Sequence, residues 1–137
     1  MKPIYENPIY KNQHICIDVE ESEIPWLKIF AQDNCKEMTD CSPETKQQIW
    51  ALLDLIEHEM LTYYQPEKIN IASFANYVPQ VHWHIMARYK EDSYYPEPMW
   101  GEKQREGKLD LPSMQDFISR LVEKINNEIK AHPPTFT

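Results

Sequence analysis

One short segment constrains this chain more than any other. Residues 80–86 read Gln-Val-His-Trp-His-Ile-Met, so polar side chains alternate with apolar ones. Because successive side chains of a β-strand point to opposite faces, a strand here presents Gln80, His82 and His84 on one face and buries the apolar residues on the other. The polar face then carries two imidazoles about 7 Å apart along the strand, next to a carboxamide.

Two adjacent imidazoles on one strand face predict a functional site. At neutral pH an imidazole can act as nucleophile, general acid or base, or metal ligand. The alternative is that His82 and His84 are ordinary surface residues of a half-buried strand. A core strand rarely needs two neighbouring titrating groups on its open face, so we favour the functional interpretation.

The same segment resembles the signature of the histidine triad (HIT) superfamily, His-φ-His-φ-His-φ-φ with φ apolar. Gln80 stands at the position of the first histidine. The flanks resemble a bacterial branch of HIT-like nucleotide hydrolases, in which glutamine is common there. The strand continues through Ala-Arg into an acidic segment with Pro and Trp (residues 87–101), and an upstream Ile-Pro-Trp-Leu-Lys-Ile-Phe run (residues 24–30) also matches. The resemblance covers about residues 13–130.

The resemblance implies roles for the residues of the motif. His82 is the expected nucleophile, with its Nδ1–H held by the main-chain carbonyl of residue 80. His84 is expected to donate a hydrogen bond to a phosphate oxygen or to the leaving group. Gln80 can donate through its amide but cannot carry charge. Asn76, just before the strand, and Asn70 are the further expected contacts to phosphate or ribose.

Arg88 and the aromatic residues leave alternatives open. Arg88 shares a strand face with His82 by parity, so it is a candidate phosphate contact, or else it forms a surface ion pair with the acids at 91 and 92. Trp26 and Phe30 either line a base pocket or belong to the core. Trp100 either anchors the irregular segment or closes a site across a dimer. The histidine that the family often carries after the second strand has no counterpart here.

Composition limits the function classes. At 137 residues the chain is expected to be one domain, residues 1–137, and 42% apolar residues fit a packed fold. Fourteen basic against 22 acidic residues give a net charge of −8, which disfavours nucleic acid and anionic membranes as partners but allows a small phosphate ligand. No run is long enough to span a membrane, and the first eight residues lack the apolar core of a signal peptide, so we expect a cytoplasmic protein.

The three cysteines fit this expectation as reduced thiols. They are Cys16, Cys35 and Cys41, an odd number without Cys-x-x-Cys spacing. A zinc site at Cys35 and Cys41 has little support, because their six-residue spacing is not that of known zinc ligand pairs.

The periodicity predicts an α+β fold. Helices are expected at 42–65, where Ser42 and Pro43 form a helix start, and at 113–130. Strands are expected at 13–19, 26–30, 68–74 and 78–89, and residues 90–112 lack periodicity. This order suggests an antiparallel sheet with one helix packed on it and the other at its edge. The resemblance implies a HIT-like sheet of about five strands and a homodimer that joins two sheets.

These observations predict a nucleotide hydrolase or nucleotidyl transferase. It would act at the α-phosphate of a nucleotide conjugate, such as a dinucleoside polyphosphate or a nucleoside phosphoramidate, through a covalent nucleotidyl-histidine. The covalent step requires no metal or other cofactor. One alternative is a nucleotide-binding protein with little turnover, because the first histidine is missing. Another is a metal-dependent enzyme that uses the His-x-His pair as ligands, with Glu91, Asp92 or Cys35 as the third ligand.

Overall fold

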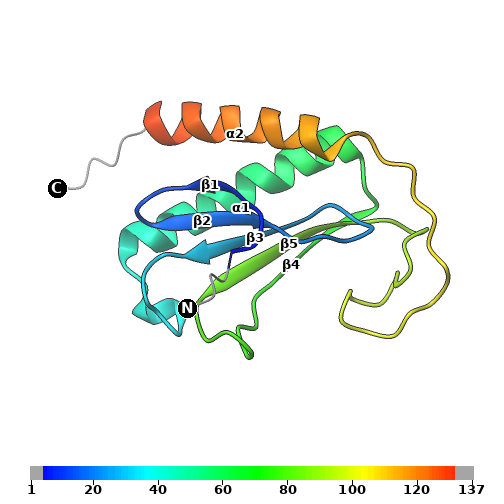
Figure 1. Cartoon of the computed structure of the whole chain (residues 1–137), viewed down its shortest axis with the longest axis horizontal. Helices are drawn as coiled ribbons and strands as arrows, with labels where there is room; N and C mark the ends of the chain where they lie inside the picture. The colour runs from blue at the N-terminus through cyan, green and yellow to red at the C-terminus, as the bar shows by residue number, and fades with distance from the viewer. Residues whose placement is uncertain (1–4, 132–137) are drawn as a thin grey trace.

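The computed structural model describes residues 5–131, which form five strands, two α-helices and one short 3-10 helix. The strands form one antiparallel sheet in the order β1-β2-β3-β5-β4 (Figure 1). The elements are β1 (Pro8–Lys11), β2 (Ile15–Val19), β3 (Trp26–Ala31), η1 (Met38–Asp40), α1 (Pro43–Tyr64), β4 (Lys68–Ala72), β5 (His82–Arg88) and α2 (Met114–Ala131).

Both helices cover one face of the sheet and leave the other face to the motif histidines. Helix α1 packs on β2, β3 and β5, and α2 contacts α1 and the edge strand β1 (Figure 1). The buried face of the sheet is rich in β-branched isoleucine, which suits a half-buried pleated surface. Its core residues are Ile15, Ile17, Leu27, Ile29, Ala31, Ile69, Ile85 and Ala87, packed against Ile49, Leu52, Leu53, Ile56, Met60, Phe117, Leu121 and Ile125.

The ends of α1 follow from its sequence. The hydroxyl of Ser42 caps the helix by accepting a hydrogen bond from the backbone N–H of Thr45 at 3.2 Å, and Pro43 occupies the first helical position. Gln65 ends the helix in the left-handed conformation (φ 51°). The prediction of a helix at 42–65 is confirmed to within a residue. Within residues 5–131, no helix is long and apolar enough to cross a membrane.

The strand predictions need three corrections. Strand β1 was missed, because Pro8 and a β-bulge between residues 8 and 10 interrupt its alternation. The motif strand starts at His82 instead of residue 78. The backbone N–H of Gln80 bonds to the carbonyl of Val78 in a tight turn, and Pro79 has no N–H to donate to a ladder. Strand β4 ends at Ala72, two residues earlier than predicted.

The expectation of three reduced thiols is wrong in this structure. Cys35 and Cys41 form a disulfide, with Cα atoms 5.4 Å apart, and only Cys16 is a free, buried thiol. Their short separation in sequence gave no indication of pairing, since the loop between them is brought back by η1. The carbonyl of Cys35 accepts a hydrogen bond from the N–H of Val81, so the disulfide loop borders the start of β5.

Candidate active site

The two motif histidines lie side by side on the open face of the sheet. Within the β3–β5 pairing, His82 is opposite Phe30 and His84 is opposite Lys28. Each histidine is 9% exposed, and their ring centroids are 5.1 Å apart. The parity of the strand therefore placed both imidazoles as predicted, close enough to act on one small group.

His82 is held with one nitrogen free. Its Nδ1 lies 2.8 Å from the main-chain carbonyl of Gln80, the acceptor predicted for it. Because a carbonyl oxygen only accepts, Nδ1 carries the proton and Nε2 keeps its lone pair. Phe30 stacks on the ring at 4.6 Å between centroids. Burial lowers the pKa of His82 below its ordinary value, and the nearby Lys28 adds to this, whereas the hydrogen bond that the ring donates to the Gln80 carbonyl acts in the opposite direction. A neutral imidazole with a free Nε2 is the form a nucleophile needs.

His84 is held in the opposite way. The indole N–H of Trp26 donates to Nδ1 of His84 at 3.0 Å. Burial, followed by the neighbouring His82 and Lys28, lowers the pKa of His84 to about 4. His84 is therefore neutral at pH 7 as well.

The side chain of Gln80 makes contacts within the protein. Its amide donates to the carbonyl of Ala31 and, at 3.4 Å, to the hydroxyl of Tyr5. Its predicted contact with a phosphate oxygen stays a prediction. The side chain ties the start of β5 to the end of β3 and to the N-terminal segment.

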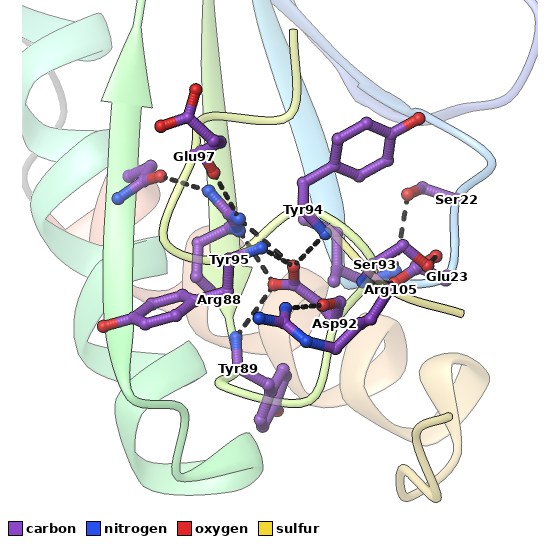
Figure 2. A network of polar contacts seen from close by, with 12 residues as sticks. Ser22, Glu23, Arg88, Tyr89, Asp92, Ser93, Tyr94, Tyr95, Glu97 and Arg105 are labelled. Atoms are coloured by element: carbon purple, nitrogen blue, oxygen red, sulfur yellow. Dashed lines mark hydrogen bonds and ion pairs between the residues drawn. The ribbon is translucent and has the colours of Figure 1, made fainter. Parts of the chain in front are cut away.

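Arg88 forms an ion pair with Asp92, one of the two acids named in its alternative role, but the pair is buried instead of lying at the surface. Its Nε lies 2.9 Å from the carboxylate of Asp92, and its side chain is 2% exposed. The guanidinium also donates to the side-chain oxygen of Asn70 and to the carbonyl of Glu97 (Figure 2). Both residues lie on the expected face, where Arg88 binds Asn70 and the segment after β5, and their predicted contacts with substrate stay predictions.

Asp92 is the centre of this network. Its carboxylate accepts hydrogen bonds from the backbone N–H groups of Tyr89, Tyr94 and Tyr95 as well as from Arg88 (Figure 2). Burial alone would raise the pKa of the carboxyl, but these hydrogen bonds outweigh it and hold the pKa below its ordinary value. The irregular segment 91–108 is thereby folded back onto the end of the sheet.

A second contact fixes the same segment to the turn before β3. The backbone N–H and hydroxyl of Ser93 donate to the two carboxylate oxygens of Glu23 at 2.6 and 2.7 Å. The N–H of Gly107 in turn donates to the Ser93 hydroxyl. Residues predicted to be irregular are therefore irregular but held by polar contacts.

The folded-back segment brings an aromatic residue to His84. The Trp100 ring lies 4.9 Å from the His84 ring, edge to face, and also contacts Trp26 and Phe74. Trp100 thus reaches the site from the same chain. Asn76 lies in the exposed β4–β5 loop, and its predicted contact with substrate stays a prediction.

Lys28 and Asp18 are site residues that the sequence analysis missed. The Lys28 ammonium lies 2.8 Å from Glu20 and 3.6 Å from Asp18, on the same sheet face as His84. Asp18 is fully buried, and its Oδ2 has no hydrogen-bond partner among residues 5–131. Alternation within residues 26–30 would have placed Lys28 on the face of Trp26 and Phe30.

The group of described side chains that could hold a metal ion does not include the motif histidines. Within residues 5–131, the ligand atoms of Asp33, Cys35 and Cys41 come within 4.8 Å of one another, and the group includes neither motif histidine. Cys35 is disulfide-bonded and Asp92 is paired with Arg88. Neither supplies the third ligand that a site at His82 and His84 would need.

The fold and the site define an α+β protein with a pair of neutral histidines on the open face of an antiparallel sheet, one bonded at Nδ1 to a carbonyl and the other to an indole N–H. A family model described as HIT domain matches residues 3–91. The chain belongs to the HIT family. Membership supports a function in nucleotide hydrolysis, nucleotidyl transfer or nucleotide binding in general terms. Among curated proteins, none matches this chain.

Solved structures of HIT proteins share the fold. A histidine triad protein from Bradyrhizobium japonicum aligns with a TM-score of 0.70 and 28% identity over 86% of this chain and 89% of its own. One from Sinorhizobium meliloti 1021 aligns with a TM-score of 0.67 and 26% identity over 85% and 87%. One from Marinobacter aquaeolei VT8 has a TM-score of 0.66 over 91% and 89%, and at 19% identity it shows the fold alone.

Proposed function

We propose that the protein hydrolyses or transfers the nucleotidyl group of a nucleotide conjugate through a covalent intermediate on His82. Dinucleoside polyphosphates and nucleoside phosphoramidates are the substrate classes with a suitable α-phosphate. The observation that carries the proposal is the 2.8 Å contact between Nδ1 of His82 and the carbonyl of Gln80. It leaves Nε2 unprotonated and supports the positive charge that develops on the ring after attack.

The reaction proceeds in two displacements. The Nε2 lone pair attacks the α-phosphorus, the bond to the leaving group breaks, and the leaving group departs with that electron pair and, once released, takes a proton from water. Water then attacks the phosphorus of the nucleotidyl-histidine and loses a proton to solvent. The phosphorus–nitrogen bond breaks, the electron pair returns to Nε2, and a nucleoside monophosphate is released. An alcohol or amine in place of water gives transfer, and neither step requires a metal.

A trapping experiment tests the covalent step. Wild-type protein is mixed with conjugate labelled in the nucleotide and quenched in denaturant, and protein-bound label is measured before and after mild acid. We expect acid-labile label on the wild type and none on His82→Asn. His58→Asn is the matched control, because His58 is exposed on α1, and α1 covers the face of the sheet opposite the motif histidines. Equal labelling of His82→Asn and wild type would contradict the proposal.

A nucleotide-binding protein with little turnover is the second candidate. The engaged amide of Gln80 favours it, because no donor replaces the imidazole that the family carries at that position. Calorimetric binding of AMP together with the absence of any hydrolysis product from either substrate class would support this candidate over the first.

A two-fold homodimer is proposed for the assembly. Strand β4 is an edge of the sheet and exposes Ile71, and α1 exposes Leu61. Unpaired edge strands favour association unless they are covered. Light scattering at micromolar concentration should give a dimeric mass for the wild type and a monomeric mass for Ile71→Lys. A monomeric wild type would contradict the proposal.

A further inference from the structure

Trp26 makes a directional contact with the ring of His84. Trp26 is the first residue of β3 and His84 lies in β5, 58 positions later. The indole nitrogen of tryptophan carries a hydrogen and has no lone pair to offer, so it can only donate. At 3.0 Å from Trp26 Nε1, Nδ1 of His84 must therefore be the unprotonated nitrogen. The hydrogen of the neutral ring is then on Nε2.

No other polar contact within residues 5–131 competes for this ring. The hydrogen bond from Trp26 is the one bond in which the His84 side chain takes part there. The aromatic rings next to His84 are those of His82, Trp26 and Trp100, at centroid distances of 5.1, 5.7 and 4.9 Å. A ring that is 9% exposed and faces other rings has few alternatives to a donor that points directly at one nitrogen.

The two motif histidines are consequently held in opposite tautomers. The carbonyl of Gln80 keeps the hydrogen of His82 on Nδ1, and the indole of Trp26 keeps the hydrogen of His84 on Nε2. In both rings the nitrogen left without a protein partner is Nε2. One Nε2 presents a lone pair and the other presents a hydrogen. The lone pair on Nε2 of His82 suits an attack at phosphorus, and the hydrogen on Nε2 of His84 suits donation to the departing atom.

We propose that Trp26 is a positioning residue that sets His84 as an Nε2–H donor toward the leaving group. This inference rests on the proposed nucleotidyl-histidine chemistry for its kinetic consequence, but its tautomer prediction does not. Without the indole donor, the Nδ1–H tautomer of His84 becomes accessible. In that tautomer Nε2 carries a lone pair instead of a hydrogen, and this lone pair would repel the electron-rich departing atom.

The kinetic test compares two leaving groups on the same nucleotide. In Trp26→Phe the aromatic body stays and the N–H is lost. An alkyl amine needs a hydrogen-bond donor as it departs, so kcat for the alkyl phosphoramidate should fall on the order of 10–100-fold. Nitrophenolate departs without such help, so kcat for the nitrophenyl ester should fall by less than about threefold. KM should change little for either substrate. Trp50→Phe, an exposed tryptophan on α1, is the matched control.

A double-mutant cycle separates positioning from a general loss of structure. In the His84→Ala background, Trp26→Phe should cause no further fall in kcat for the phosphoramidate, because the ring that it positions is gone. Equal and additive losses with both leaving groups would overturn the proposal.

The tautomers can be measured without any turnover. Two-dimensional ¹⁵N–¹H spectra distinguish Nδ1–H from Nε2–H histidines, and the His84→Ala spectrum identifies the His84 signals. The wild type should show His84 as Nε2–H, and Trp26→Phe should show a mixture or the Nδ1–H form. An Nδ1–H His84 in the wild type, or an unchanged Nε2–H form in a folded Trp26→Phe, would overturn the proposal. If the tautomers are as expected but no substrate is turned over, the proposed function fails and the role of Trp26 stands as a structural one.

Discussion

Arg88 and Asp92 form a buried ion pair at the end of β5, and this pair helps to position Trp100 in the site. Arg88 also binds the carbonyl of Glu97, three residues before Trp100 (Figure 2). Through these contacts the segment after β5 turns back along the sheet, and Trp100 comes to lie against His84. Arg88 lies on the same face of β5 as His82 and His84.

Breaking this pair should be costly. Arg88→Met leaves the Asp92 carboxylate buried without its charge partner, which typically costs about 3–5 kcal/mol. We expect a fall in Tm on the order of 10 °C by calorimetry, together with loss of turnover. Lys90→Met is the control: its ion pair with Glu67 is at the surface and spans 3.8 Å. Its effect should be below about 1 kcal/mol. Similar Tm values for both variants would show that the pair does not hold the segment.

His82 should be required for chemistry and dispensable for folding. His82→Asn should retain the wild-type far-UV circular dichroism and lose turnover by several orders of magnitude, because an asparagine amide has no nucleophilic nitrogen to replace Nε2. His84→Ala should cost about 10²–10⁴-fold, as for the loss of a donor. His58→Asn should behave as wild type in the same assay. Near wild-type turnover by His82→Asn would instead favour a mechanism without a covalent histidine.

Stability should decrease in mild acid because of the buried histidines. The pKa of His84 falls from 6.5 in an unfolded chain to about 4 in the fold, chiefly through burial. Between these values the unfolded chain binds more protons, so stability is complete above about pH 6.5 and is lost as the pH falls toward 4. The shift corresponds to about 3 kcal/mol. Urea unfolding at about pH 7 and 4.5 should show a smaller loss for His84→Asn than for the wild type. An equal loss in both would exclude His84 as its source.

The sequence allowed prediction of those features that depend on nearby residues. Helix α1 was placed to within a residue because Ser42 and Pro43 mark its start locally. The shared face of His82 and His84 followed from strand parity, and the carbonyl that holds His82 followed from the family resemblance. The engaged amide of Gln80 could not be predicted, because its partner Ala31 is 49 positions away. The contact between Trp26 and His84 depends in the same way on strands that pair only in the folded sheet.

The cysteine pair was missed although its members are only six residues apart in sequence, and it leads to a direct test. Thiol titration in denaturant of protein purified without reductant should give one thiol per chain, from Cys16, and three after reduction. A cross-link over a loop this short contributes about 2 kcal/mol by restricting the unfolded chain. Reduction, or the Cys41→Ser substitution, should therefore lower the Tm by several degrees, whereas Cys16→Ala should leave the response to reductant unchanged. Three titratable thiols before reduction would show that Cys35 and Cys41 are unpaired, and the start of β5 would then lack this covalent support.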